Sequence, residues 1–189
     1  YSTGTNNTVV GREAFKAFTT ATNNTIVGDA AGDAITTGPG NVAVGRSALG
    51  AVNTGDYNVA VGYQAGDGLR AGYTNVAIGY EALGNADSDR STTAVGQSAA
   101  SLQNLGAVTS YNTAIGSSAQ YKNSNTGIHM TTVGANAGHY ATGSYNTFVG
   151  SQAGKGGTTS APYSSGTYNT AIGFQALTAF TTAASNVAV

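Results

Sequence analysis

Asn58-Val59-Ala60-Val61-Gly62 is one copy of a five-residue motif, Asn-(Thr/Val)-x-(Val/Ile)-Gly, that recurs eleven times along 189 residues, with x usually small. The motif glycines are 17 residues apart over the first six copies, and the later steps are 20, 18, 16 and 23 residues. The last copy, Asn186-Val187-Ala188-Val189, ends before its glycine. A sustained period of this length indicates a solenoid in which each repeat packs on the next. We therefore expect residues 1–189 to form a single repeat array and a segment of a longer chain.

Two β-branched columns mark a strand in each repeat. The residue before the motif glycine is Val or Ile in every copy, and the residue two positions earlier is Thr or Val. Side chains two apart lie on one face of a strand, and no helical period is present. We predict an all-β parallel roll of about 17 residues per coil, built as strand, turn, short return strand and turn. Both columns are predicted to face inward, with a core of Val10, Val27, Val44, Val61, Ile78, Val95, Ile115, Val133, Val149 and Ile172.

The column between them is then predicted to face outward. It is mostly alanine, which is unusual for a surface in water and indicates a face covered closely by another chain. The alternative is an uncovered stripe on a lone solenoid. The predicted contacts between chains are Ala43, Ala60, Ala77, Ala94, Ala114 and Ala171.

Three further columns predict how the coils stack. The motif asparagine recurs in nine copies and is expected to form a hydrogen-bonded ladder from coil to coil. The motif glycine is expected to adopt positive φ where the strand ends. The alanine three residues after it, present in all ten complete copies, indicates a tight interior position.

Composition excludes several classes of function. A net charge of −1 argues against nucleic acid binding, and the absence of cysteine excludes disulfides and thiolate metal sites. No apolar run is long enough for membrane insertion. The two histidines, His129 and His139, have no acidic neighbour, and Asp87-Ser88-Asp89 indicates a solvated turn more than a cation site. We therefore expect no catalytic residues, no cofactor and no metal.

Tyrosine is the enriched surface residue. Tyr57, Tyr111, Tyr145 and Tyr168 precede the motif asparagine. Exposed aromatic side chains anchor sugars and protein surfaces, but we favour the alternative that these tyrosines cover the coil corners and pack with neighbouring chains. The insertion at Lys155–Ser165 is expected to loop outward, with or without a role. The candidate receptor contacts are Lys155, Tyr163, Tyr63 and Tyr80.

The columns also resemble two known groups of repeats. They are similar to the Asn-Ser-Val-Ala-Ile-Gly head repeats of YadA-type trimeric autotransporter adhesins. Tyr168-Asn169-Thr170-Ala171-Ile172-Gly173-Phe174-Gln175-Ala176-Leu177 resembles, more closely still, the Asn-Thr-Ala-Ile-Gly-Tyr-Gln-Ala-Leu arrays of bacteriophage tail fibres. The resemblance implies a left-handed roll that forms a side-by-side homotrimer, exposed on a cell surface or virion and used for attachment. The adhesin head period is shorter, and the adhesin neck, stalk and anchor are not in this sequence.

The sequence therefore predicts a structural and adhesive segment of an extracellular trimeric attachment fibre, either a phage tail fibre or a bacterial adhesin. Its partner would be a glycan or a surface protein. One alternative is an ice-binding solenoid with ranks of threonine, disfavoured because valine shares the threonine column and that column is predicted to face inward. The other alternative is a self-assembling extracellular filament without a receptor.

Overall fold

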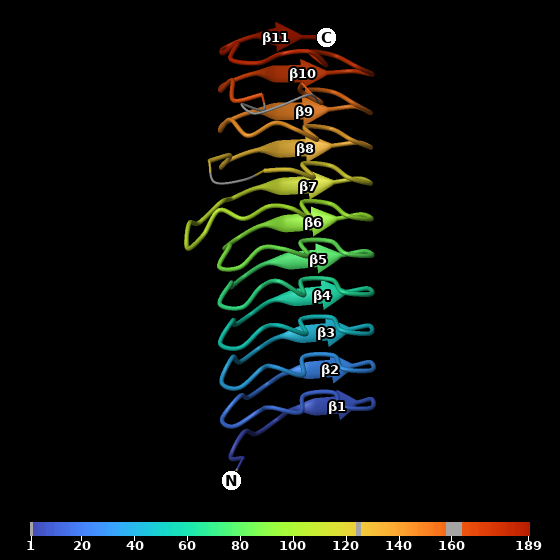
Figure 1. The fold of residues 1–189 in the computed structure, drawn as a ribbon, viewed down its shortest axis with the longest axis vertical. Coiled ribbons are helices and arrows are strands. Elements are labelled where there is room, and N and C mark those ends of the chain that lie inside the picture. The colour runs from blue at the N-terminus through green and yellow to red at the C-terminus, as the bar shows by residue number, and fades with distance from the viewer. Residues whose placement is uncertain (1, 124–125, 158–163) are drawn as a thin grey trace.

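The computed structural model describes residues 2–123, 126–157 and 164–189, and in these ranges the chain is an all-β parallel solenoid (Figure 1). About ten coils of about 17 residues stack in chain order, with the termini at opposite ends of the rod. The described ranges contain no helix, and so no helical segment that could cross a membrane. The strands are β1 (Thr8–Val10), β2 (Thr25–Val27), β3 (Val42–Val44), β4 (Val59–Val61), β5 (Val76–Ile78), β6 (Thr93–Val95), β7 (Thr113–Ile115), β8 (Thr131–Val133), β9 (Thr147–Val149), β10 (Thr170–Ile172) and β11 (Val187–Ala188).

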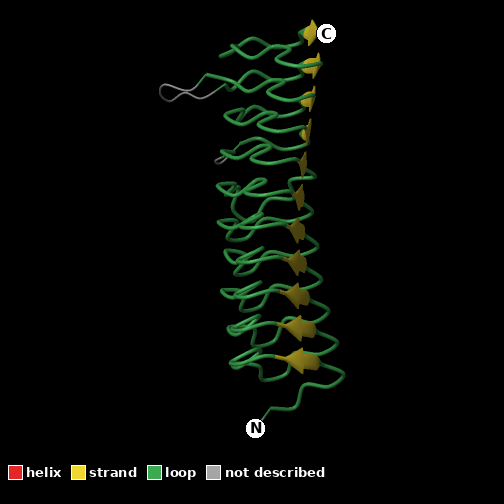
Figure 2. Ribbon diagram, turned by 90° about the vertical axis from the view of Figure 1, so that its right-hand side faces the viewer, coloured by secondary structure: helices red, strands yellow, loops and turns green. Residues whose placement is uncertain are grey.

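All these strands form one sheet, in which each strand pairs in parallel with the strand of the next coil. The motif copies are in register, so that Val59 pairs with Val76 and Ala60 with Ala77. At the ~4.8 Å spacing of paired strands, the rod is about 50 Å long. Figure 2 shows the sheet on one side of the rod and the return segments on the other. The predicted parallel β-roll is confirmed.

The motif asparagines form the predicted ladder. Asn58 Oδ1 accepts the backbone N–H of Asn75 at 3.0 Å and the Asn75 side-chain amide at 3.1 Å. Asn58 Nδ2 donates to the backbone oxygen of Gly72 at 2.8 Å. Because Asn58 is fully buried, the ladder satisfies backbone groups that water does not reach. At Thr92 and Met130 the backbone N–H still donates to the preceding asparagine, but these residues have no amide to extend the ladder.

The return side consists of turns, and the predicted short return strand is wrong. Corners with positive φ recur in the coils, for example at Tyr57 (54°) and Gln64 (52°). A residue in this conformation cannot continue a strand, so the return chain bends repeatedly. It is held to the next coil by backbone bonds such as Leu49 N–H to Ala65 O at 3.0 Å. Outside the strands, the described residues form only isolated bridges, at Tyr73–Arg90, Arg90–Thr109 and Ala141–Ser164.

The two faces of each strand are the reverse of the prediction. The alanines predicted to contact other chains point into the roll and have no exposed surface: Ala43, Ala60, Ala77, Ala94, Ala114 and Ala171. The residues predicted to form the core lie on the outside, exposed or partly exposed: Val10, Val27, Val44, Val61, Ile78, Val95, Ile115, Val133, Val149 and Ile172. Both assignments are therefore wrong.

The physical reason lies in how the narrow roll is filled. Large apolar side chains enter the core from the return side, among them Leu49, Val52 and Leu69, which are all fully buried. Protein interiors are packed to nearly crystalline density, so only a small residue fits opposite them on the strand. The alternation of side chains separates two faces of a strand but does not say which one is inside.

Where a strand carries a large central residue, glycine on the return side makes room for it. Phe148 in β9 is fully buried, and a Cβ at Gly154 would overlap its ring. A Cβ at Gly138 would stand 3.2 Å from the same ring. In β2, a Cβ at Gly32 would stand 3.1 Å from Ile26. In these coils the large residue is on the strand and the small one is on the return side, so the core volume is preserved.

The motif glycine and the alanine after it behave as predicted. Gly62 has a φ of 136°, and a Cβ there would also stand 2.6 Å from the carbonyl oxygen of Gly79 in the next coil. Glycine is therefore required both by the backbone conformation and by the close approach of the coils. Ala48 and Ala65, three residues after their motif glycines, are fully buried.

A polar layer divides the apolar core into two clusters. Gln103 Nε2 donates to Thr92 Oγ1 at 2.9 Å. Gln103 Oε1 accepts from Asn112 Nδ2 at 3.1 Å and from Gln120 Nε2 at 3.3 Å. Gln103 lies in the 20-residue step, so the longest described departure from the period inserts polar groups into the core.

Candidate interaction surfaces

The exposed face of the sheet is a stripe of β-branched residues that runs the length of the rod. We name it the outer sheet face; it consists of two ranks of side chains. The first rank is Thr8, Thr25, Val42, Val59, Val76, Thr93, Thr113, Thr131, Thr147, Thr170 and Val187. The second rank is Val10, Val27, Val44, Val61, Ile78, Val95, Ile115, Val133, Val149, Ile172 and Val189.

The outer sheet face is uncharged; its second rank is Val or Ile throughout, and its first rank is threonine at seven positions and valine at four. Ile78 is 39% exposed and Ile172 is 46% exposed, although both are large aliphatic side chains. With two ranks about 7 Å apart along a rod about 50 Å long, the strip between the ranks is about 350 Å². The continuous apolar part is the second rank, which the threonine methyl groups and valines of the first rank widen; exposed patches of a few hundred Å² are often interaction sites.

An aromatic ladder borders the outer sheet face on the side where the strands begin. The rings of Tyr111, His129, Tyr145 and Tyr168 stack coil upon coil, with centroids 5.1, 5.0 and 4.9 Å apart. Tyr111 is 60% exposed and Tyr168 is 61% exposed. Because the inner ring faces contact one another, the ladder presents mainly ring edges and hydroxyl groups to the outside. Stacking of a sugar on these inner faces is therefore blocked.

A second column borders the sheet where the strands end. Arg12 and Arg46 both pair with Asp29, at 2.9 and 3.5 Å. The guanidinium of Arg46 lies 5.7 Å from the ring centroid of Tyr63, which stacks on Tyr80 at 5.4 Å. A hydrogen bond to the carboxylate of the neighbouring Glu81 raises the pKa of Tyr80. The column is a mixed ionic and aromatic edge.

The predicted receptor contacts are not brought together. Tyr63 and Tyr80 form one stacked, exposed pair, whereas Lys155 lies several coils further along the rod and is partly buried. Burial lowers the pKa of His139, and the positive charge of Lys155 lowers it further. Tyr163 lies outside the described residues. Receptor contact by these residues stays a prediction.

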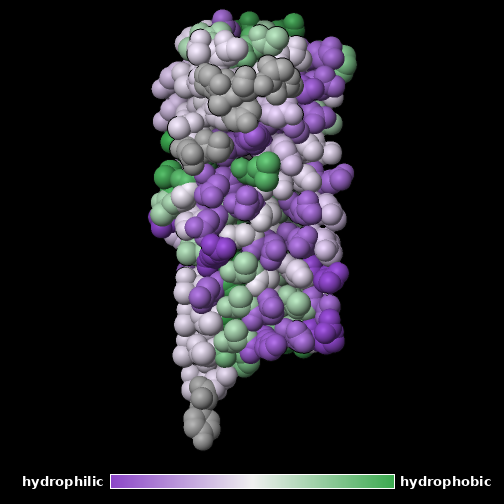
Figure 3. Space-filling view, viewed as in Figure 1, coloured by the Kyte–Doolittle hydropathy of each residue, from purple (hydrophilic) through white to green (hydrophobic). Residues whose placement is uncertain are grey.

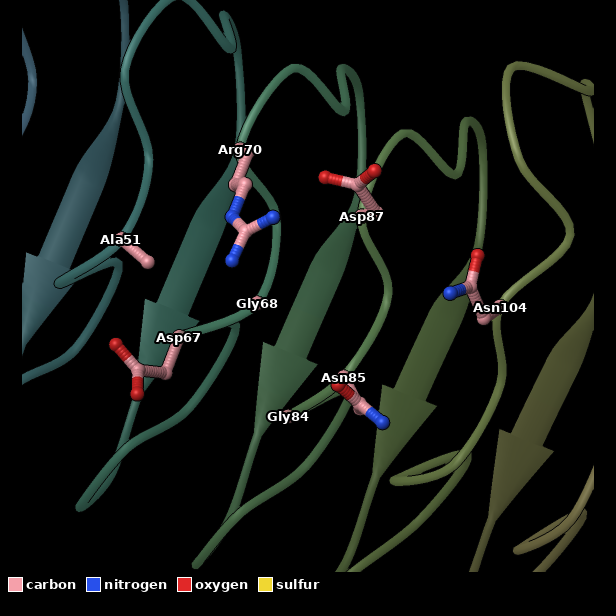
Figure 4. A pocket seen from close by; sticks show the side chains of 8 residues that line it. All are labelled: Ala51, Asp67, Gly68, Arg70, Gly84, Asn85, Asp87 and Asn104. Carbon is pink, nitrogen blue, oxygen red and sulfur yellow. The ribbon is translucent and has the colours of Figure 1, made fainter.

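A polar hollow on the return side was not predicted from the sequence. We name it the return groove (Figure 4). Its main part has a volume of about 310 Å³, and an adjoining part of about 210 Å³ shares Asp67, Gly84 and Asn85 with it. The main part is lined by Ala51, Asp67, Gly68, Arg70, Gly84, Asn85, Asp87 and Asn104, and the adjoining part adds Gln64, Glu81 and Ser101.

The groove is hollow because its floor is built from small residues. A Cβ at Gly68 would stand 2.6 Å from the carbonyl oxygen of Gly84, so close coil packing requires glycine there. Burial raises the pKa of Asp67, and the charge of nearby Asp33 raises it further. Figure 3 shows one face of the rod as a mixture of hydrophilic and weakly apolar residues, with a few strongly apolar ones between them. The only signal for the groove in the sequence was a small residue on the return side of successive coils, at a distance from the motif glycine that varies from coil to coil.

No arrangement typical of metal binding occurs among the described residues, where no three His, Cys, Asp or Glu side chains gather. His129 lies in the aromatic ladder, and His139 stacks on Tyr121 with its Nδ1 3.0 Å from the Ser118 carbonyl oxygen. Asp89 is not in a solvated turn as predicted. It is fully buried, its Oδ1 accepts the backbone N–H of Leu105 at 2.8 Å, and burial raises its pKa.

Comparisons with family models, with curated proteins and with solved structures give no significant match for this chain.

Proposed function

We propose that this chain is a structural and adhesive segment of an extracellular trimeric attachment fibre, in the setting of a phage tail fibre or a bacterial adhesin. The observation that carries the proposal is the outer sheet face, an uncharged stripe whose second rank is apolar along the whole sheet. In water such a stripe is stabilised when another apolar surface covers it. The repeat resemblance supports a left-handed roll and three chains, and we adopt both as part of the proposal.

The alanines are buried inside each chain, so we propose that the chains touch one another through the outer sheet face. Three parallel rods that place this face toward a common axis would each bury the two ranks that include Val61 and Ile78. The area, about 350 Å² per chain from the strip between the ranks alone, is below the ~800 Å² per partner of a standard interface. The bordering columns with Tyr63 and Tyr145 lie beside the ranks and would add to it.

The mechanism of such a segment is mechanical. Hydrogen bonds along the sheet and along the asparagine ladder join each coil to the next, which gives a stiff rod. Three copies in one fibre would present each surface feature three times, so weak contacts to a surface would combine into a strong one. The proposed partner is a glycan or a surface protein, and the proposed location is extracellular.

The test is the solution mass of this segment by sedimentation equilibrium. The expected result is a trimer for the wild-type chain and a monomer for Val61→Lys/Ile78→Lys, because two lysines on each copy would be buried side by side. Ala71→Lys is the matched control, since Ala71 is exposed and lies outside the sheet. A wild-type monomer, or a trimer unaffected by the double substitution, would sink the proposed interface.

Ice binding is a second candidate, because the threonine rank lies on the outside and not on the inside as predicted. Thr8, Thr25 and Thr131 are exposed and in register along a parallel sheet. Regularly spaced hydroxyl and methyl groups on such a face could order water. A thermal hysteresis assay at micromolar protein tests this candidate, and activity in a monomer would replace the fibre proposal. End-to-end polymers seen by electron microscopy without a partner would favour the receptor-free filament.

A further inference from the structure

We propose that the return groove binds an uncharged oligosaccharide that lies along the rod axis. This inference rests on the proposed attachment function and names a site and a ligand class for it. The groove runs from Ala51 in one coil to Asn104 three coils further on, a distance of about 14 Å at the strand spacing. That length and the volume of about 310 Å³ suit a short run of sugar rings.

The side chains around the groove offer both kinds of hydrogen-bonding group. Arg70, Asn85 and Asn104 present donors, and Asp67 and Asp87 present carboxylate acceptors. Within the described part of the chain, the side chains of Arg70, Asn85 and Asp87 have no hydrogen-bond or ion-pair partner. A sugar hydroxyl is donor and acceptor at once, so a row of hydroxyls matches such a mixed lining.

The groove is preformed. Its floor at Gly68 and Gly84 is fixed by contact between successive coils, and the coils are tied by backbone bonds such as Ala51 N–H to Asp67 O at 3.2 Å. A ligand would therefore enter a site whose shape already exists, without an ordering cost for the backbone. This matters for a polar ligand, which gains little from apolar burial.

The charge of the groove selects against acidic sugars. Three carboxylates line the groove and its adjoining part, those of Asp67, Asp87 and Glu81, against one guanidinium, that of Arg70. The resulting negative potential would repel uronic, sialic and sulfated sugars, so the ligand is expected to be uncharged. A basic peptide would suit the charge, but it would leave the Arg70 guanidinium without a partner.

The groove also lies where a receptor could reach it in the fibre. It is on the return side of the rod, whereas the sheet occupies the opposite side (Figure 2). Packing of the outer sheet faces around a common axis would therefore leave the groove open to solvent. Each trimer would present three grooves pointing away from its axis.

The test starts from an array of uncharged gluco-, galacto- and manno-oligosaccharides, with sialylated and sulfated glycans as the anionic set. The tightest ligand is then titrated calorimetrically into the wild-type chain and into Arg70→Ala and Asn85→Ala. Both variants are expected to bind at least tenfold more weakly. Arg46→Ala, which removes the same charge outside the groove, is expected to bind like the wild type.

Three results would overturn the inference. The first is an array on which no uncharged oligosaccharide is retained. The second is binding that neither Arg70→Ala nor Asn85→Ala weakens. The third is tighter binding of anionic glycans, or of a trilysine peptide, than of any uncharged sugar. The solution mass of the same sample separates this inference from the proposed function, because a trimer without sugar binding rejects only the groove.

Discussion

Asn58→Ala tests whether the asparagine ladder holds the coils together. The substitution leaves two buried groups without a partner, the backbone N–H of Asn75 and the carbonyl oxygen of Gly72. Two neighbouring hydrogen bonds survive the substitution. The backbone N–H of residue 58 still donates to Asn41 Oδ1 at 2.9 Å, and Asn75 Nδ2 still donates to the carbonyl oxygen of Asp89 at 2.8 Å. A buried unsatisfied group costs about 1–3 kcal/mol, so two predict a loss of about 2–6 kcal/mol in the free energy of unfolding.

Two measurements check this prediction. Urea denaturation gives the change in unfolding free energy, and hydrogen exchange gives the protection of the Asn75 amide, which should fall because its acceptor is removed. Asn85→Ala is the matched control, because the Asn85 side chain is exposed and should change stability by less than about 0.5 kcal/mol. If Asn58→Ala behaves like Asn85→Ala and the Asn75 amide stays protected, the ladder does not stabilise the roll.

Asn58→Thr sharpens the test, because threonine occurs naturally at the same motif position in Thr92. There the hydroxyl has partners of its own, Ser110 Oγ at 2.6 Å and Gln103 Nε2 at 2.9 Å. Gln103 belongs to the 20-residue step, which the coil of Asn58 lacks. We therefore expect Asn58→Thr to be destabilising as well, by an amount close to that of Asn58→Ala.

Phe148→Ala is expected to lower the free energy of unfolding by about 3–5 kcal/mol. Gly154→Ala should cost less in the Phe148→Ala background than in the wild type, because the ring that blocks a Cβ at residue 154 is gone. A double-mutant cycle in urea measures this coupling. Ala60→Leu should overpack the core and cost about 1–3 kcal/mol, while Val61→Leu on the outer sheet face should change the unfolding free energy by less than about 0.5 kcal/mol. Burial lowers the pKa of His139, so the stability it contributes is complete above pH ~6.5 and should be lost as pH falls from there through the lowered pKa of the folded chain; His139→Gln should flatten the profile below pH ~6.5.

The sign of the pH effect follows from the protons bound in each state. Below pH ~6.5 the unfolded chain takes up a proton at His139 that the folded chain resists, which favours unfolding. The raised pKa values of Asp67 and Asp89 act in the opposite direction, since their contribution to stability grows as pH falls and is complete only below ~3.9. His129→Gln is the matched control for His139→Gln, and equal profiles for the two variants would contradict the prediction. For the core prediction, unfolding free-energy losses of Phe148→Ala and Gly154→Ala that simply add in the double variant would contradict a packing contact between the two positions.

The features that the sequence predicted correctly are those that the backbone enforces. The position of each strand, the parallel register, the asparagine ladder and the motif glycine all follow from groups that must be satisfied or brought close in every coil. Such constraints leave one residue type in every complete copy, as in the column of Gly62, or in nearly every copy, as in the column of Asn58. They are therefore visible in a single sequence with internal repeats.

The orientation of the strand was predicted wrongly, because β-branched residues were assumed to mark the inside. Which face is buried depends on the volume supplied by the opposite wall, and that wall carries Leu49, Val52 and Leu69. These large residues stand four or seven residues after their motif glycines, so the sequence already shows that the opposite wall is bulky. A small residue such as Ala60 could therefore have been recognised as the inner residue of the strand. The return groove had no comparable signal, since it depends on Gly68 and Gly84, which occupy different positions in their coils.

With the observed strand orientation, trimer formation and ice binding would both use the outer sheet face. A face covered by two other copies cannot bind ice, so trimer formation and ice binding exclude each other on the same residues. The first rank carries valine in three successive coils, at Val42, Val59 and Val76, which interrupts any lattice of hydroxyl groups. The second rank is Val or Ile throughout, so what stays constant along the rod is apolar surface and not hydroxyl spacing. Constant apolar surface is what burial against another chain requires, and it is the physical ground for placing the fibre before ice binding.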